Sequence, residues 1–292
     1  MNPDDHSRIE TVDPPHSLPA FRDLHSATTM TLSSSQLQEL QLARQLLENP
    51  GLAAKISNLV GTPLERGFAM LPARWNAAVS SATRAAIEKA LDVALRTLDD
   101  ETRPPPANRL HKLAVGTAGA AGGAFGLVAL PLELPLSTTV MLRSIADIAR
   151  SEGEELRSPE GRLQCLQVLA LGGPAAADDA TDTGYFAVRA ALAQAVSEAA
   201  RHIAKHGLAA SGAPAIVQLI TQIASRFSIN VSQKIAAQAV PMVGAVGGAV
   251  VNTLFIDHFQ GMARGHFIVR RLEREFGTET IRRAYRELGS AR

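Results

Sequence analysis

Two stretches of this chain run for about twenty residues each without a charged side chain, the length of helix that crosses a bilayer. The first covers Leu113–Leu132 and the second covers Ala236–Ile256. Both contain closely spaced glycines, which allow two helix backbones to touch when they fall on one face. The pattern therefore indicates a helical protein that either packs unusually tightly or meets a membrane.

The glycines of both stretches recur at helical spacing and so follow one face of a helix. They are Gly116, Gly119, Gly122, Gly123, Gly126, Gly244, Gly247 and Gly248. Each glycine in a helix costs about 1 kcal/mol relative to alanine, so a stripe of them implies compensation by close contact. We expect the two segments to pack face to face; the alternative is that they lie against lipid. Alanine and glycine are weakly apolar, which favours peripheral contact with a membrane over a full crossing.

The fold class follows from periodicity. Apolar residues recur at helical intervals along most of the chain, and no run alternates long enough to form a strand. Aromatic residues make up only 4% of the sequence, which also favours helices over sheets. We predict an all-α, multi-helix bundle with the two glycine-rich helices at its centre.

Proline marks the predicted domain organisation. Residues 1–34 show no sustained period and are expected to form a disordered tail. Helices in 35–103 should pack on the core, which we place at 110–292. Three consecutive prolines make 104–109 a linker, because proline cannot continue a helix.

Charge and cysteine content exclude several classes of protein. The net charge of +1 argues against a nucleic-acid binder. The single cysteine, Cys165, cannot form an internal disulfide and lies in an apolar helical segment, so we expect it to be buried. The N-terminus lacks a basic start followed by an apolar core, and we expect a cytoplasmic location, peripheral at the inner face of the cell membrane.

Glu133 is a lone charge between Pro131 and Pro135. We expect the helix to break there, with the freed backbone groups satisfied by Ser137, Thr138 and Thr139. One interpretation pairs Glu133 with a buried arginine such as Arg143. The other makes it a carboxylate of raised pKa that acts in catalysis or ion binding.

Few other residues suggest chemistry. His266 is a candidate base, and Glu133 is the candidate that would act with it. Thr138, Thr139, Arg143 and Asn252 are candidate ligand-binding residues. No phosphate-binding loop, nucleophile elbow or metal-ligand spacing occurs, so we expect no metal and no cofactor.

Several blocks resemble the EcsC family of bacterial proteins. They are GTAGAAGGAFGLVALPLELPLSTTVMLRSIADIARSEGEE, PEGRLQCLQVLALGG, GYFAVRAAL and VPMVGAVGGAVVNTLFIDHFQGMARGHFIVRRLEREFG. The resemblance covers Leu46 to Tyr285 and implies a helical fold. It supplies no catalytic residues, because no biochemical activity is established for the family.

Three functions are consistent with these observations. The first is a non-catalytic helical protein that associates peripherally with the membrane, or with a membrane protein, through the glycine-rich helices. The second is an enzyme acting on a lipid-like substrate in a pocket lined by Glu133, Thr138, Arg143 and His266. The third is a soluble helical scaffold. The second requires that these four side chains converge on one cavity.

Overall fold

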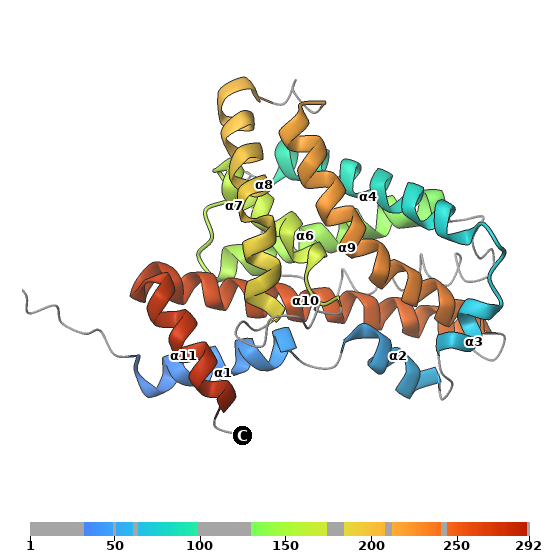
Figure 1. Cartoon of the computed structure of the whole chain (residues 1–292), viewed down its shortest axis with the longest axis horizontal. Coiled ribbons are helices and arrows are strands. Elements are labelled where there is room, and N and C mark those ends of the chain that lie inside the picture. Colours follow the sequence, from blue (N-terminus) through green and yellow to red (C-terminus); the bar gives the residue numbers. More distant parts are fainter. Residues whose placement is uncertain are drawn as a thin grey trace, which may run out of the picture. The chain divides into compact units, whose positions relative to one another are not determined.

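The computed structural model describes residues 32–48, 51–60, 64–98, 130–173, 184–207, 212–240 and 244–290. These residues form ten α-helices and one short 3₁₀ helix, and no strand occurs among them, which confirms the all-α prediction (Figure 1). The helices are α1 (Ser34–Glu48), α2 (Leu52–Val60), α3 (Leu64–Ala69), α4 (Trp75–Thr97), α6 (Leu130–Ser151), α7 (Pro159–Gln167), η2 (Val168–Ala170), α8 (Gly184–His206), α9 (Pro214–Gln238), α10 (Gly244–Phe276) and α11 (Thr278–Ser290).

The chain divides into two units, Met1–Thr31 and Leu32–Arg292. The first unit lies outside the described residues. Within the second, α1 packs on α10, and α4 packs on both α6 and α9. The linker predicted at 104–109 also lies outside the described residues and stays a prediction.

Helix ends fall where the local sequence places them. Ser158 caps α7, because its hydroxyl oxygen accepts a hydrogen bond from the amide of Gly161 over 3.0 Å, and Pro159 follows as the first helical residue. Gly207 and Gly277 follow α8 and α10 with φ of 67° and 85°, a conformation that side chains rarely adopt. These starts and stops agree with the sequence.

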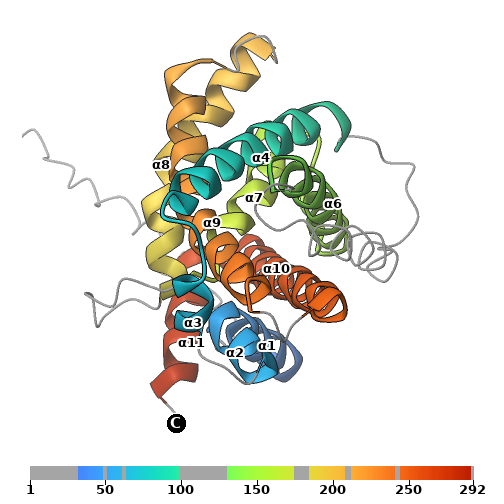
Figure 2. The same cartoon turned by 90° about the vertical axis from the view of Figure 1, so that its right-hand side faces the viewer.

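Helices α6 and α10 lie side by side and run in the same direction. Gln260 donates to the Ser144 hydroxyl over 2.6 Å, and Arg270 donates to Glu154 over 2.7 Å, both across 116 positions of sequence. Because the sequence offset is the same at both contacts, α6 and α10 run parallel. Figure 2 views this pair close to end-on. Helix α10 is the longest of the described helices, and its Phe255, Phe259 and Phe267 are fully buried in the core.

The predicted helix break at Glu133 is wrong. Pro131, Glu133 and Pro135 all lie within the first turns of α6. Pro131 is the second helical residue, where the missing N–H has no intrahelical acceptor in any case. Pro135 removes one backbone hydrogen bond, and the Thr139 hydroxyl donates to the Pro135 carbonyl over 2.8 Å. A helix therefore tolerates both prolines.

Only part of the predicted glycine packing falls in the described structure. Gly116, Gly119, Gly122, Gly123 and Gly126 lie outside the described residues, so their contact with the second stretch stays a prediction. Gly244, Gly247 and Gly248 form the first turns of α10, and Gly248 is buried.

Close helix contacts occur at other glycines. A Cβ on Gly265 of α10 would lie 2.9 Å from the Ala43 carbonyl oxygen and 2.7 Å from Leu47 Cγ, both of α1. A Cβ on Gly67 of α3 would overlap the backbone carbonyl of Ala236 in α9. In the described part of the chain, tight helix packing thus occurs at Gly265 and Gly67, which lie outside the two glycine-rich stretches.

Charge is distributed unequally along the α6–α10 pair. The first thirteen residues of α10, Gly244–Ile256, carry no charge, whereas its last turns contain Arg270, Arg271, Glu273 and Arg274. Their acidic partners Glu152 and Glu154 follow the last residue of α6. Among the described helices, none combines the length and apolar character needed to cross a membrane.

Candidate functional site

A fully buried histidine on α10 joins two other helices through hydrogen bonds. His266 Nδ1 lies 3.0 Å from the Tyr185 hydroxyl of α8, and its Nε2 lies 3.2 Å from Gln164 Oε1 of α7. The three side chains are 0%, 5% and 7% exposed. We call them the tyrosine–histidine–glutamine chain.

Gln164 fixes the direction of these hydrogen bonds. Its Oε1 can only accept, so His266 Nε2 carries the proton and donates to it. The Nδ1 of the neutral histidine then accepts from the Tyr185 O–H, whose oxygen also accepts from Arg189 Nη1 over 3.3 Å. The amide NH₂ of Gln164 is left pointing away from the histidine.

Burial keeps His266 neutral. Desolvation is the main cause that holds the pKa of His266 well below its ordinary value, and the positive charges of Arg189 and Arg270 lower it further. Burial likewise raises the pKa of Tyr185. Both shifts favour the neutral forms of His266 and Tyr185, which suits a hydrogen-bonded chain that orients its members.

Ion pairs surround the tyrosine–histidine–glutamine chain. Arg189 donates to both carboxylate oxygens of Glu273 over 2.9 Å each, and Arg270 donates to both oxygens of Glu154 over 3.1 and 2.7 Å. Two-point contacts of this kind hold the planar guanidinium groups in one orientation.

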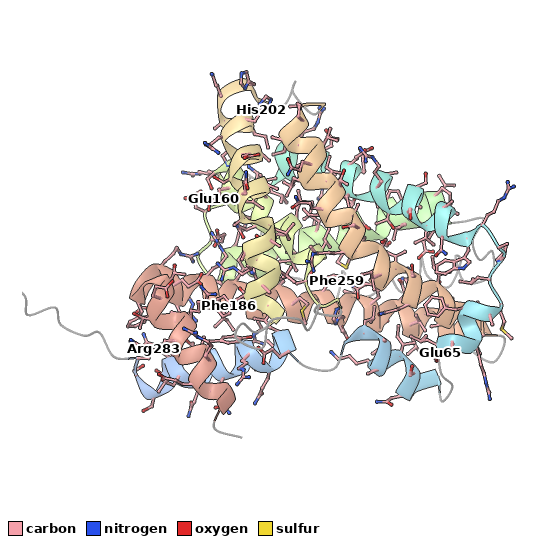
Figure 3. The ribbon with its side chains drawn as sticks, viewed as in Figure 1. Glu65, Glu160, Phe186, His202, Phe259 and Arg283 are labelled. Atoms are coloured by element: carbon pink, nitrogen blue, oxygen red, sulfur yellow. The ribbon has the colours of Figure 1, made fainter. Side chains whose placement is uncertain are left out.

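A cavity of about 340 Å³ opens beside these ion pairs. We call it the arginine cavity; α7, α8, α10 and α11 contribute its walls. Its lining residues are Glu160, Gln164, Gln167, Phe186, Arg189, Ala190, Ala193, Val196, Ser197, Arg270, Glu273, Thr278 and Arg282. Figure 3 labels Glu160 and Phe186, which lie on the α7 and α8 walls.

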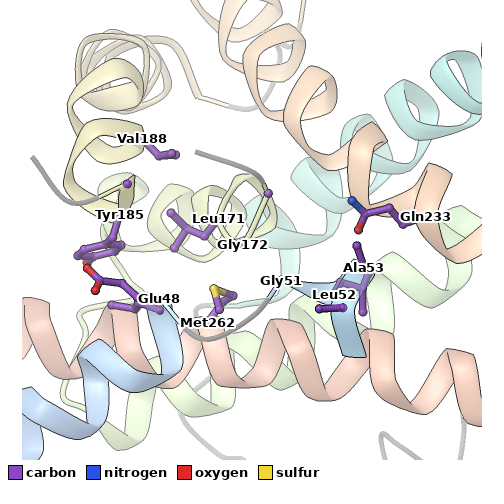
Figure 4. A pocket seen from close by; sticks show the side chains of 14 residues that line it. Glu48, Gly51, Leu52, Ala53, Leu171, Gly172, Tyr185, Val188, Gln233 and Met262 are labelled. Carbon is purple, nitrogen blue, oxygen red and sulfur yellow. The ribbon is translucent and has the colours of Figure 1, made fainter. Parts of the chain in front are cut away.

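A second cavity, of about 460 Å³, is more apolar (Figure 4). Leu52, Leu171, Val188 and Met262 contribute to its walls, and Tyr185 belongs to them as well. Tyr185 and Glu48 lie at one side of this apolar cavity and Gln233 at the other.

Gly172, with φ of 74°, lines the apolar cavity and sits against the ring of His258. Burial, together with the positive charge of the nearby Lys55, lowers the pKa of His258 to about 4.

Glu133 has a partner, which is not the arginine that the sequence suggested. Its carboxylate accepts a hydrogen bond from the ammonium of Lys234 on α9 over 2.7 Å. The Lys234 nitrogen also lies 5.2 Å from the centre of the Phe255 ring. Arg143 is half-buried elsewhere on α6.

The four residues of the proposed enzyme pocket do not converge. At the α6–α10 offset of 116 positions, His266 lies level with Arg150. Glu133 precedes Arg150 on α6 by about 25 Å of helix, at about 1.5 Å per residue. None of Glu133, Thr138, Arg143 and His266 lines either cavity described above. The geometry therefore removes the support for a pocket shared by these residues.

The remaining candidates have separate surroundings. Thr138 is fully buried on α6, and Thr139 donates to a backbone carbonyl. Asn252 is buried on α10, about level with Thr138. Cys165 is buried as expected, and burial raises the pKa of its thiol. In the part of the chain that the structure describes, no group of histidine, cysteine and carboxylate side chains is placed to hold a metal ion.

The model of the EcsC protein family matches residues 34–272, which is most of the chain. The chain belongs to the EcsC family. The match to EcsC begins at the first residue of α1 and includes Gln164, Tyr185 and His266, whereas α11 with Thr278 and Arg282 lies beyond it. Comparisons with curated proteins and with solved structures found no match to this EcsC-family chain.

Proposed function

We propose that this EcsC-family protein is a non-catalytic helical protein that associates peripherally with a lipid bilayer through the N-terminal ends of α6 and α10. The observation that carries the proposal is the exposure of two leucines on α6. Leu132 is 83% exposed and Leu136 is 58% exposed. They lie four residues apart and so project from the same face of the helix.

The sequence around these leucines is free of unpaired charge. Glu133, the only charged residue of α6 before Arg143, is neutralised by Lys234 and is 9% exposed. Val250 of α10 is 38% exposed and lies level with the leucines at the α6–α10 offset. Exposed apolar side chains gathered where α6 and α10 carry no unpaired charge are typical of a surface that meets lipid or a partner.

Helix α3 adds to the same end. It packs against the C-terminal part of α9 through Gly67 and Ala236, and Met70, which follows α3, is 55% exposed. Arg66 and Arg74 are exposed on either side of Met70. Arginines beside apolar residues suit a bilayer with anionic headgroups, because the charge stays in water while the apolar groups enter the interface. We therefore favour lipid over a protein partner.

The test is co-sedimentation of the full chain with vesicles of phosphatidylcholine containing phosphatidylglycerol. Complete burial of a leucine is worth about 1.5–3 kcal/mol, and about 1.4 kcal/mol is a factor of ten in an equilibrium constant. We expect Leu132→Gln with Leu136→Gln to weaken vesicle binding at least about tenfold.

The matched control is Leu37→Gln with Leu42→Gln on α1. These leucines are 38% and 37% exposed, and α1 meets the charged end of α10 through the Glu39–Arg271 ion pair. This control should bind vesicles as the unchanged protein does. Absence of vesicle binding by the unchanged protein, or equal loss in both double variants, would contradict the proposal.

A further inference from the structure

The arginine cavity contains a buried polar side chain that the fold itself does not use. Gln167 lines the cavity, is 3% exposed, and makes no hydrogen bond to the described part of the chain. The Gln167 amide is therefore available to form hydrogen bonds with whatever occupies the cavity, water or a ligand.

The tyrosine–histidine–glutamine chain directs a second amide to the same place. Gln164 accepts from His266 through Oε1, so its NH₂ group remains available on the cavity side. Gln164 and Gln167 are three residues apart on α7 and present neighbouring amides. The hydrogen-bonded chain thereby fixes one of them as a donor.

The other free groups are also donors. The ion pairs with Glu273 and Glu154 leave Arg189 Nε and Arg270 Nη1 without a hydrogen-bond partner in the described residues. Thr278, the first residue of α11, lines the cavity, and Ile281 is the first residue of that helix to bond back, to the Gly277 carbonyl. The amides before Ile281 have no intrahelical acceptor.

The charge and shape of the arginine cavity limit which ligands it can bind. Three arginines and two glutamates line the cavity, and a further glutamate, Glu154, pairs with Arg270 beside it. Arg189 and Arg270 thus already have carboxylate partners, which suits a monoanion better than a phosphate dianion. A volume of about 340 Å³ is far more than one ion needs, and Phe186, Ala190 and Ala193 provide an apolar wall.

We propose that the arginine cavity binds a small organic monocarboxylate. Its oxygens accept hydrogen bonds from Gln164, Gln167 and the guanidinium groups. Its apolar part lies against the Phe186 and alanine wall of α8. This inference does not depend on membrane association.

Isothermal titration of the full chain tests it, with benzoate and hexanoate as probes and benzamide and inorganic phosphate as comparisons. We expect saturable one-to-one binding of at least one acid, with benzamide and phosphate at least about tenfold weaker. Gln167→Leu should weaken acid binding about tenfold and leave the melting temperature unchanged, because the Gln167 amide makes no hydrogen bond to the described part of the chain.

Ala193→Phe and Ala191→Phe form a matched pair. Both alanines are exposed on α8, but only Ala193 lines the cavity. Ala193→Phe should abolish binding by filling the cavity, whereas Ala191→Phe should leave it unchanged. No saturable binding of either acid, equal binding by Ala193→Phe, or phosphate or benzamide bound as tightly as the acids would each overturn the proposal.

Discussion

The ammonium of Lys234 lies 2.7 Å from the carboxylate of Glu133, and the two side chains are only 2% and 9% exposed. The pair joins α9 to the first turns of α6 across 101 positions of sequence. Both residues lie in uncharged surroundings, so each buried charge is compensated by the other.

Breaking this ion pair should destabilise the protein strongly. Lys234→Met leaves Glu133 buried and uncompensated, and we expect the free energy of unfolding to fall by about 3–5 kcal/mol. Adding Glu133→Leu should recover most of that loss, because two apolar side chains then replace the two charges. Urea unfolding followed by circular dichroism measures both. Lys89→Met, which removes an exposed pair with Asp92, is the control and should have little effect.

Two glycines one helical turn apart on α10 should respond oppositely to alanine. A Cβ on Gly261 would meet Leu46 Cδ2 at 3.6 Å, an ordinary contact, whereas one on Gly265 would crowd the backbone of α1. We expect Gly261→Ala to gain up to about 1 kcal/mol from helix propensity. Gly265→Ala should lose stability despite the same gain. Thermal melts of the two variants decide this, and equal shifts in one direction would contradict the described packing of α1 on α10.

Stability should decline as the pH falls below neutrality. The folded state holds the pKa of His258 near 4 and that of His266 well below its ordinary value, whereas both titrate near 6.5 when unfolded. The unfolded chain therefore binds more protons below pH 6.5, and the free energy of unfolding falls by up to about 1.4 kcal/mol per pH unit for each histidine.

Urea midpoints measured from pH 7.5 down to about pH 5, above the range where carboxylates titrate, isolate this effect. His258→Gln should remove about half of the slope. A slope in His258→Gln equal to that of the unchanged protein would show that this histidine is accessible to protons in the folded state.

The contributions of Tyr185 and Gln164 to stability should be coupled through His266. Tyr185→Phe leaves His266 Nδ1 without its donor, and we expect a loss of about 1–3 kcal/mol. Gln164→Leu removes the acceptor on the other side. The double variant should lose less than the sum of the two single losses, because both act through one histidine. Strict additivity in urea unfolding would mean that the chain does not act as a unit.

Local signals are sufficient to place several helix ends. Ser158 and Pro159 mark the start of α7, and Gly207 and Gly277 mark helix ends, because each of these effects is decided by residues within one turn. The helix through Pro131 and Pro135 was missed, since proline tolerance depends on position within the first turns.

Long-range partners could not be predicted. Tyr185 and Gln164 lie 81 and 102 positions from His266, and Lys234 lies 101 positions from Glu133. No local spacing indicates such pairs. The wrong expectation of Arg143 arose from proximity in sequence, whereas α9 brings Lys234 to Glu133 through packing. One signal was available: Gln164 and Gln167 are amides in an otherwise apolar helical segment.

The depth of Leu132 in a bilayer tests the proposed function most directly. Cys165 is buried and its thiol pKa is raised, so a cysteine introduced at the surface is the residue that a maleimide fluorophore labels. Leu132→Cys and Leu37→Cys, labelled and mixed with vesicles containing brominated lipid, compare the uncharged end of α6 with the distant face of α1. The account predicts strong bromine quenching at position 132 and none at position 37. Equal quenching at the two positions, or none at either, would contradict it.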